Sequence, residues 1–312
     1  MRDVSDVIES HRERVRAADP LVAVTDLGSV TDLGGGWFET AGAVGASATI
    51  TADPAARAVH WGPPTTHSLH ARAAGDDPAD ALGRLLDRWI AALDPEPGSG
   101  LVVSWPSRDT APVAALARRG FAPRSVRAVR TRPAAAGEPP SPGVRQASAG
   151  DLDALCALYL ELVGYEAQFG WIEVLPSTPA AARAEIEGKL ARGDGWCWLA
   201  ETGGEAVGML AVHHPAHAAG PAACVNASPV AYVGSMYARP GSRGRGVGAA
   251  LAAHAHAEAA AAGVGTILVD YVAPNPLSGP FWSRQGYRPL ITTWGRLTPS
   301  GHGAAQRGGS AG

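Results

Sequence analysis

The chain has 312 residues, of which 46% are hydrophobic, and its formal net charge is −3. This length allows two domains of ordinary size, and the composition is that of a soluble globular protein. The small net charge gives no reason to expect nucleic acid as a partner, and no stretch is apolar enough to predict a membrane span. The first residues do not resemble a signal peptide and the three cysteines lack paired spacing, so we expect a cytoplasmic protein with reduced thiols.

The first half of the sequence predicts alternating helices and strands. Residues 5–17 carry apolar side chains spaced for one helical face. A helix over 78–93 is clearer, because Asp77 can cap it and Pro78 suits its first turn. The expected elements that follow are a strand at 101–105, a short helix at 111–119 and a strand at 125–130.

This order of strand, helix and strand recurs later in the chain. Setting Gly120 against Gly286, an offset of 166 positions, also aligns Phe121 with Tyr287. We therefore interpret residues 1–132 as a degenerate copy of the domain that follows. Residues 133–143 are rich in proline and alanine, which predicts a linker with nothing to bury.

The second half opens with a short predicted strand at 144–147 and an amphipathic helix that begins near Asp151. A stretch dense in aromatic and acidic residues follows at 165–173, and we place it in a loop between two helices. The next expected elements are a helix at 180–191, a hairpin formed by 196–201 and 206–213, a strand at 231–238, a helix at 246–262 and a strand at 265–272.

The most informative stretch is the glycine-dense loop at 243–249, which lies between the strand at 231–238 and an alanine-rich helix. Glycines let the backbone approach a ligand closely. The first N–H groups of a helix lack intrahelical partners and lie at the positive end of its dipole. The stretch therefore predicts a site for a phosphate or pyrophosphate group.

Three kinds of phosphate loop compete for this stretch. A P-loop ends in Lys-Ser or Lys-Thr, which Val247-Gly248-Ala249 does not offer. A Rossmann dinucleotide loop fits better, since Asp270 lies near the expected acidic position, but the segment from Ala238 to Gly244 is too long for its tight turn. The pattern Arg243-x-x-Gly246-x-Gly248 resembles the acetyl-CoA loop of the GNAT (GCN5-related) N-acetyltransferases.

A second stretch strengthens the resemblance to the GNAT family. Asn275 and the segment that ends in Gly286-Tyr287 are similar to a later family motif, in which an asparagine contacts CoA and a short helix ends in Gly-aromatic. The resemblance implies an α/β fold with a mixed (α+β) sheet and two tandem GNAT-like domains. The N-acetyltransferase domain is expected at 144–298, with the intact loop, and a disordered tail at 299–312.

The resemblance also implies that acetyl-CoA is the acyl donor. In the family, the strand before the loop binds the pantetheine arm and the loop binds the pyrophosphate. The first half lacks such a loop, and Asp76 and Asp77 at the start of its helix would repel a pyrophosphate. By motif position, the expected CoA-binding residues are Met236, Tyr237, Ala238, Arg243, Gly244, Arg245, Gly246, Val247, Gly248, Ala249, Asn275 and Ser278.

The sequence matches the family pattern at only one of the two catalytic positions. One branch of the family has a carboxylate base on the second strand, and Asp270 occupies that position here. The usual proton donor is a tyrosine seven residues after the asparagine, where this chain has Trp282. Indole is no general acid near neutral pH, so Tyr237, Tyr271 and Tyr287 are the substitutes. Of these we take Tyr237 as the candidate donor.

The sequence leaves three functional hypotheses. The first is an acetyl-CoA-dependent N-acetyltransferase that acts on a primary amine, either a small molecule or a peptide. Aromatic and acidic residues at 165–173 would suit a cationic amine. The second is a non-catalytic acyl-CoA-binding protein, and the third is a Rossmann-type dinucleotide binder. We interpret the first half as a structural or dimerising domain, so a homodimer is possible. The spacing of His67 and His70 matches no common metal site, and we expect no metal.

Overall fold

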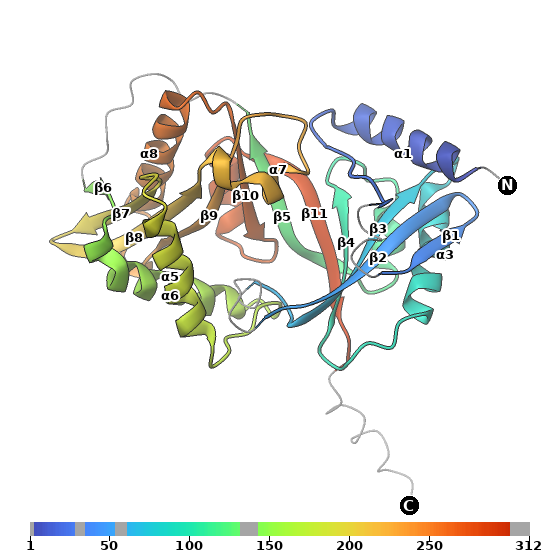
Figure 1. Cartoon of the computed structure of the whole chain (residues 1–312), viewed down its shortest axis with the longest axis horizontal. Coiled ribbons are helices and arrows are strands. Elements are labelled where there is room, and N and C mark those ends of the chain that lie inside the picture. The colour runs from blue at the N-terminus through green and yellow to red at the C-terminus, as the bar shows by residue number, and fades with distance from the viewer. Residues whose placement is uncertain (1–2, 29–34, 54–60, 132–142, 300–312) are drawn as a thin grey trace, which may run out of the picture.

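The computed structural model describes residues 3–28, 35–53, 61–131 and 143–299. Within these residues the strands form one eleven-stranded sheet that passes through both halves of the molecule (Figure 1). The predicted linker and tail lie outside the described residues, except for Gly143 and Pro299. The mixed α/β fold expected from the sequence is confirmed.

The first half contains the predicted helices and the predicted strands near 101–105 and 125–130. Its elements are α1 (Val4–Ala18), β1 (Trp37–Thr40), β2 (Ala43–Thr51), β3 (Thr65–Ala73), α3 (Pro78–Ala91), β4 (Gly100–Pro106), α4 (Val113–Ala117) and β5 (Ala122–Arg130). The carboxylate of Asp77 caps α3 by accepting a hydrogen bond of 2.9 Å from the backbone N–H of Asp80. One N–H group at the start of this helix is therefore satisfied by the protein itself.

Among the described residues the second half follows the same order, with the strand β6 before its first helix and the helices α6 and α7 in addition. Its elements are β6 (Val144–Gln146), α5 (Leu152–Ala167), α6 (Thr178–Ala191), β7 (Cys197–Thr202), β8 (Glu205–His213), α7 (Ala219–Ala222), β9 (Val230–Ala238), α8 (Val247–Ala261), β10 (Thr266–Val272), α9 (Ser278–Arg284) and β11 (Arg288–Leu297).

The predicted elements need correction in two places. Strands β1 and β3 are not foreseen; polar residues such as His67 and His70 interrupt the apolar pattern of β3, and pairing with β2 and β4 places it inside the sheet. Tyr165 and Glu166 belong to the last turn of α5 and not to a loop between helices. Their side chains are thus held by a regular helix.

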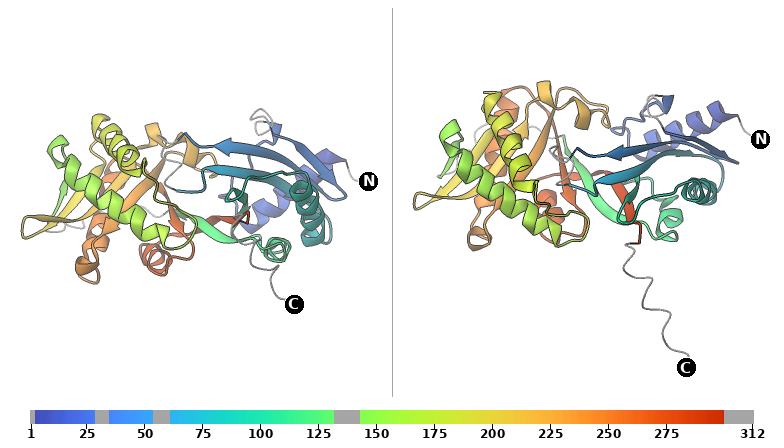
Figure 2. Two further views of the ribbon diagram at one scale, coloured as in Figure 1. Left: turned by 90° about the horizontal axis from the view of Figure 1, so that it is seen from below. Right: turned by 60° about the horizontal axis from the view of Figure 1, so that its bottom comes forward.

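The central strands of the sheet alternate between the two halves. The order across the sheet is β1-β2-β3-β4-β11-β5-β10-β9-β8-β7-β6. Strand β5 of the first half pairs with β10 and β11 of the second, and β11 pairs in turn with β4 of the first. Each half therefore supplies a strand to the sheet of the other, and in both views of Figure 2 the strands of the two halves meet near the middle of the molecule.

The sequence offset of 166 relates corresponding elements of the two halves. It superimposes β4 (Gly100–Pro106) on β10 (Thr266–Val272) and the start of β5 on that of β11. The recurring strand, helix and strand are thus present in the structure. The domain boundaries, and the interpretation of the first half as a degenerate GNAT copy, remain predictions.

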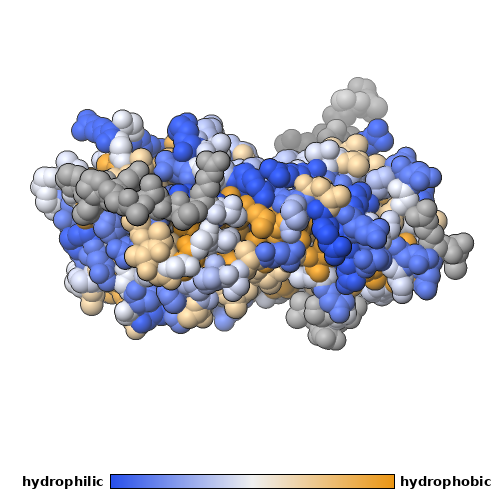
Figure 3. Space-filling view, turned by 90° about the horizontal axis from the view of Figure 1, so that it is seen from above, coloured by the Kyte–Doolittle hydropathy of each residue, from blue (hydrophilic) through white to orange (hydrophobic). Residues whose placement is uncertain are grey.

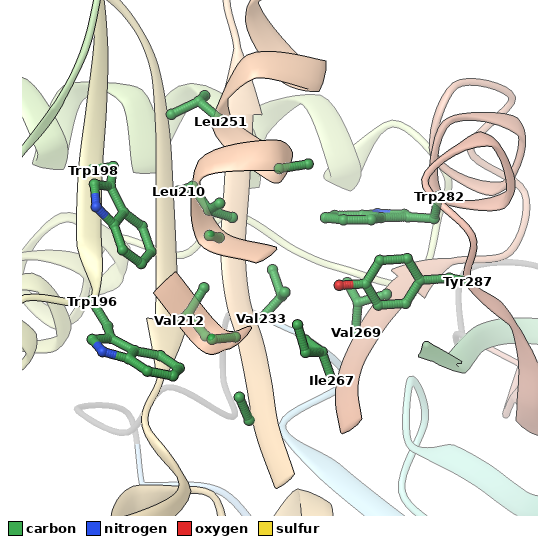
Figure 4. Packing of buried hydrophobic residues seen from close by; sticks show 14 of the residues in the cluster. Trp196, Trp198, Leu210, Val212, Val233, Leu251, Ile267, Val269, Trp282 and Tyr287 are labelled. Carbon is green, nitrogen blue, oxygen red and sulfur yellow. The ribbon is translucent and has the colours of Figure 1, made fainter. Parts of the chain in front are cut away.

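Helices cover both faces of the sheet. In β8, Met209 and Ala211 pack against α5 and α6, whereas Leu210 and Val212 face α8. Successive side chains of a strand point to opposite faces, so this alternation shows that the strand is buried on both sides. Figure 4 shows the core beneath α8, where the rings of Trp282 and Tyr287 lie beside Val269 of β10.

The first half has the same layered arrangement. In β2, Ala43 packs in the cluster formed by α3 and α4, and Val44 and Ala46 pack against α1 on the other face. A further cluster joins Val15 of α1 to Leu290 of β11, so the halves share buried apolar surface as well as strands. In Figure 3, apolar side chains reach the surface mainly near the middle of the molecule.

No helix in the described part of the chain is long and apolar enough to span a membrane.

The shared strands predict that neither half folds alone. A chain cut after residue 137 would leave β4, β5, β10 and β11 each without at least one neighbour. Unpaired strand edges expose backbone hydrogen-bonding groups and promote aggregation. We expect residues 1–137 and 138–312 to be insoluble or unfolded when expressed separately, and to form a soluble complex when co-expressed. A cooperative thermal transition in either fragment alone would contradict the exchange of strands.

Candidate functional site

The site begins where two parallel strands separate. Strands β9 and β10 pair only from Val230 to Val233 and from Thr266 to Val269. Beyond these residues β9 continues to Ala238 along β8, and a register shift at Ala211/Val212 marks a bulge in that pairing. The open ends of the two strands face two cavities, which together form the candidate site.

The first cavity lies over the glycine loop and has a volume of about 360 Å³. We call it the glycine-loop cavity. It brings together the residues expected to bind CoA, with the exception of Arg245, which does not line it. The lining residues from that prediction are Met236, Tyr237, Ala238, Arg243, Gly244, Gly246, Val247, Gly248, Ala249, Asn275 and Ser278.

The backbone of the loop has the conformation that glycine permits. Gly244 and Gly246 have φ of +74° and +85°, in the left-handed region that other residues rarely adopt. Gly246 is also the N-cap of α8, and no side chain caps this helix. The first N–H groups of α8 are therefore open to a ligand, in contrast to α3, where Asp77 takes that position.

Arg243 brings a positive charge to the same cavity. Its Nε donates a hydrogen bond of 3.1 Å to the carbonyl of Ala238, and its guanidinium lies 4.5 Å from the ring centroid of Tyr165. A second tyrosine, Tyr237, has its centroid at 5.6 Å. These contacts hold the guanidinium beside the loop, where it adds to the positive potential of the helix N-terminus.

The second cavity lies at the junction of the two halves and has a volume of about 230 Å³. We call it the aromatic cavity, because Trp61, Trp171, Tyr232, Tyr271 and Trp282 contribute to its lining. The charged residues that line it are Arg124, Glu166 and Asp270. Trp61 and Arg124 come from the first half and the others from the second.

Glu166 lines both cavities and is the buried carboxyl group at their meeting point. Its side chain is only 6% exposed. Its Oε1 accepts a hydrogen bond of 2.7 Å from the side-chain amide of Asn275, and Oε2 has no partner among the described residues. Burial raises the pKa of Glu166 to about 7, although the hydrogen bond from Asn275 and the charge of Arg243 lower it. It can thus exchange a proton near neutral pH.

Asn275 is fixed by three hydrogen bonds. Besides Glu166, its amide nitrogen donates to the hydroxyl of Ser278 at 2.8 Å, and its Oδ1 accepts from the backbone N–H of Leu277 at 2.9 Å. The side chain is 4% exposed. Asn275 therefore orients Glu166 and shapes the start of α9, in addition to lining the cavity.

The comparisons with known proteins agree with this geometry. Residues 163–287 match the model of the acetyltransferase (GNAT) family. They form a GNAT domain. The match spans the last part of α5, the glycine loop and α9, and it assigns the domain to a family of acyltransferases.

Solved structures of GNAT proteins have a similar fold. A GCN5-related N-acetyltransferase from Sphaerobacter thermophilus is 17% identical, with a TM-score of 0.54 over 83% of this chain and 78% of that one. An acetyltransferase of the GNAT family from Colwellia psychrerythraea is 11% identical, with a TM-score of 0.51 over 96% and 98% of the two chains. No curated protein matches this sequence.

The Rossmann alternative does not agree with this fold. Strand β9, which leads into the glycine loop, pairs antiparallel with β8. The sheet of a Rossmann domain is mostly parallel around its phosphate loop. The GNAT match covers the same loop, so we set the dinucleotide binder aside.

The candidate base Asp270 lines the aromatic cavity, but its carboxylate is already engaged. Arg127 of β5 donates two hydrogen bonds to it, of 2.8 Å from Nε and 2.7 Å from a terminal nitrogen. The hydroxyl of Tyr232 donates a third at 3.2 Å. Both carboxylate oxygens of Asp270 are thus engaged by donors of the protein itself. This geometry disfavours Asp270 as the base of the GNAT domain and favours Glu166.

The aromatic residues of the predicted mechanism are mostly packed in cores. Trp282 lies edge-on to Phe281 and Tyr287, with both ring centroids at 5.0 Å. Tyr287 is buried and its hydroxyl lies 3.0 Å from Nε2 of His256. The candidate donor Tyr237 lines the glycine-loop cavity, but burial and the charge of Glu161 raise its pKa. Tyr271 lines the aromatic cavity, so two of the three candidate tyrosines border the site and geometry does not single out one donor.

Glu166 is the residue of the GNAT domain whose chemistry the sequence did not single out. It falls within 165–173, which the sequence marks as a flank of the acceptor site, but nothing there distinguishes it from Glu173. The signal is its position on α5, with Leu162 one turn earlier, which faces it toward the two cavities.

The raised pKa of Glu166 predicts a dependence of stability on pH. Its folded-state pKa of about 7 lies above the ordinary value of 4.5, so its contribution to stability is complete below the ordinary value and is lost as pH rises through about 7. Glu166→Gln should therefore raise the melting temperature by at least about 2 °C at alkaline pH and change it little at acidic pH. Equal shifts at both pH values, measured by calorimetry, would show that Glu166 titrates normally.

Proposed function

We propose that the chain is an acetyl-CoA-dependent N-acetyltransferase that acts on the primary amine of a small acceptor. The observation that carries this proposal is the position of Glu166. One buried carboxyl group with a pKa of about 7 lies between a cavity built for an anion and a cavity lined by aromatic rings. Such a group can accept a proton from an amine in the aromatic cavity while the acyl donor is held in the other.

The residues of the glycine-loop cavity suit the donor. The open N–H groups at the start of α8 and the charge of Arg243 fit the pyrophosphate of CoA. Gly248 lets α8 approach the strand closely, since a Cβ there would lie 3.0 Å from Cε of Met236. Acetyl-CoA supplies an activated acyl group as a thioester, and the backbone of β9 at 236–238 would hold its arm.

The protein must assist one main step of the reaction, the removal of a proton from the acceptor amine. The acceptor amine must lose a proton as its nitrogen bonds to the acyl carbon and the carbon–sulfur bond breaks. Glu166 takes this proton on Oε2, the oxygen without a partner among the described residues. Asn275 holds Oε1 by its hydrogen bond of 2.7 Å, which leaves Oε2 as the oxygen that can take the proton. The departing thiolate is a stable leaving group, so the process does not require a tyrosine donor.

We propose that only the second half binds CoA. The helix α3 corresponds to α8 in the order of elements, but its start is capped by Asp77 and carries a negative charge. This arrangement opposes a pyrophosphate. The first half would instead help to form the aromatic cavity, whose lining includes its residues Trp61 and Arg124.

The single donor site predicts different effects of two matched glycine substitutions. Gly246 and Gly120 both have left-handed φ, +85° and +77°, and open space around the position of a Cβ. Valine should strain both positions and cost similar stability. Gly246→Val should weaken CoA binding at least about tenfold, because it displaces the open N–H groups. Gly120→Val should bind CoA as the parent does. Equal losses in calorimetry would contradict the one-site proposal.

The proposed reaction is tested by release of the CoA thiol from acetyl-CoA in the presence of primary amines. We expect amine-dependent release whose kcat/KM rises with pH through a midpoint of about 7, set by Glu166. Glu166→Gln should lower kcat/KM by about 10²- to 10⁴-fold and remove that midpoint. Asp270→Asn serves as the comparison, and a larger loss there would restore Asp270 as the base.

The non-catalytic alternative makes a different prediction in the same assay. Trp282 occupies the position of the family's usual donor, and this replacement is the observation in its favour. CoA binding without thiol release across the amine panel would favour the binding protein over the enzyme.

A further inference from the structure

The aromatic cavity contains an arginine whose charge has no carboxylate partner. Arg124 of β5 is partly buried, and its Nε donates a hydrogen bond of 3.0 Å to the carbonyl of Gly295. Its guanidinium lies 5.0 Å from the ring centroid of Trp171. Burial lowers the pKa of Arg124, and no ion pair joins it to a carboxylate in the described part of the chain.

Two other arginines of the central sheet are paired with carboxylates, whereas Arg296, which lies outside the cavity, bonds to a backbone carbonyl. Arg127 on the same strand forms an ion pair with Asp270, and Arg288 on β11 forms one with Asp19. A partly buried charge without a partner is costly, so such groups are usually paired. Arg124 departs from this rule at the wall of a cavity, where a ligand can reach it.

We propose that the acceptor is a small aminocarboxylic acid, such as an α-amino acid with an apolar or aromatic side chain, whose carboxylate is bound by Arg124. This inference rests on the proposed function. The planar guanidinium presents parallel N–H donors that match the two oxygens of a carboxylate. The amine of the acceptor would then face Glu166, the other charged group of the cavity that no ion pair engages.

The rest of the lining agrees with such an acceptor. The indole N–H of Trp61 donates to the hydroxyl of Tyr159 at 3.2 Å, so this donor is directed away from a ligand. The rings of Trp61 and Trp171 therefore offer mainly apolar surface to a side chain. A second ammonium group on the acceptor would be repelled by Arg124, which disfavours polycationic amines.

The inference also gives the first half a role in selectivity. Arg124 and Trp61 both belong to the first half, from which no described residue lines the glycine-loop cavity. Strand β5 reaches the cavity because it lies between β10 and β11. Arg124 is in this sense a specificity-determining residue and takes no part in proton transfer.

The experiment compares acceptors that differ only in the carboxylate. L-phenylalanine, L-leucine and L-tryptophan are each paired with the corresponding amino-acid amide, in thiol-release kinetics and in calorimetric binding in the presence of CoA. We expect kcat/KM and affinity to favour the amino acid of at least one pair by about 10- to 100-fold. Arg124→Gln should abolish this preference, because it should lower kcat/KM and affinity for the amino acid far more than for its amide.

Arg296→Gln is the matched control. Arg296 also donates to a backbone carbonyl, that of Arg119, and lies 5.5 Å from the ring centroid of Phe121, but it does not line the cavity. It should keep the preference of the parent. Arg124→Lys, which retains the charge without the paired donors, should recover part of it.

The outcomes separate this inference from the proposed function. Turnover of amides or simple amines that equals or exceeds that of the amino acids would overturn the inference and leave the acetyltransferase intact. The same holds if Arg124→Gln and Arg296→Gln lower the preference equally. Without turnover of any amine the proposed function falls, and the inference is then decided by whether binding of the amino acid depends on Arg124.

Discussion

The backbone hydrogen bonds that hold β5 between β10 and β11 are the constraint on which the rest of the structure depends. They join two halves of the chain into one sheet, and each half completes the other with a strand. Because the same strand carries Arg124 and Arg127, this pairing also brings charged groups of the first half to the open ends of β9 and β10. The strand order of the sheet therefore also determines which residues of the first half line the site.

The second determinant of the site is the separation of positive and acidic groups along the two cavities. The loop before α8 presents unpaired N–H groups and Arg243, whereas Glu166 lies where the two cavities meet. Asn275 connects the two, because it holds Glu166 and lines the glycine-loop cavity. The ion pair of Arg127 with Asp270 occupies the other carboxylate that lines the aromatic cavity. Glu166 is thus the carboxyl group between the two cavities that no ion pair within the described residues engages, and burial raises its pKa to about 7.

The sequence predicts those features that depend on local geometry. The glycine loop can be predicted because Gly244 and Gly246 themselves permit the left-handed φ that precedes the helix. The start of α3 can be predicted for the same reason, since the cap by Asp77 and the proline at the first helical position lie within one turn. Such features need no knowledge of the tertiary fold.

Features that depend on contacts between distant segments were not predictable in this way. Asn275 and Glu166 are far apart in the chain, and only the packing of α5 beside the start of α9 joins them and raises the pKa of Glu166. The pairing of Arg127 with Asp270, and the exchange of β5 and β11, likewise arise from long-range strand order. A shared strand also limits how such a gene can shorten during evolution. Deleting the first half would strip β10 and β11 of their neighbour β5, so natural selection that keeps the second half folded preserves the first as well.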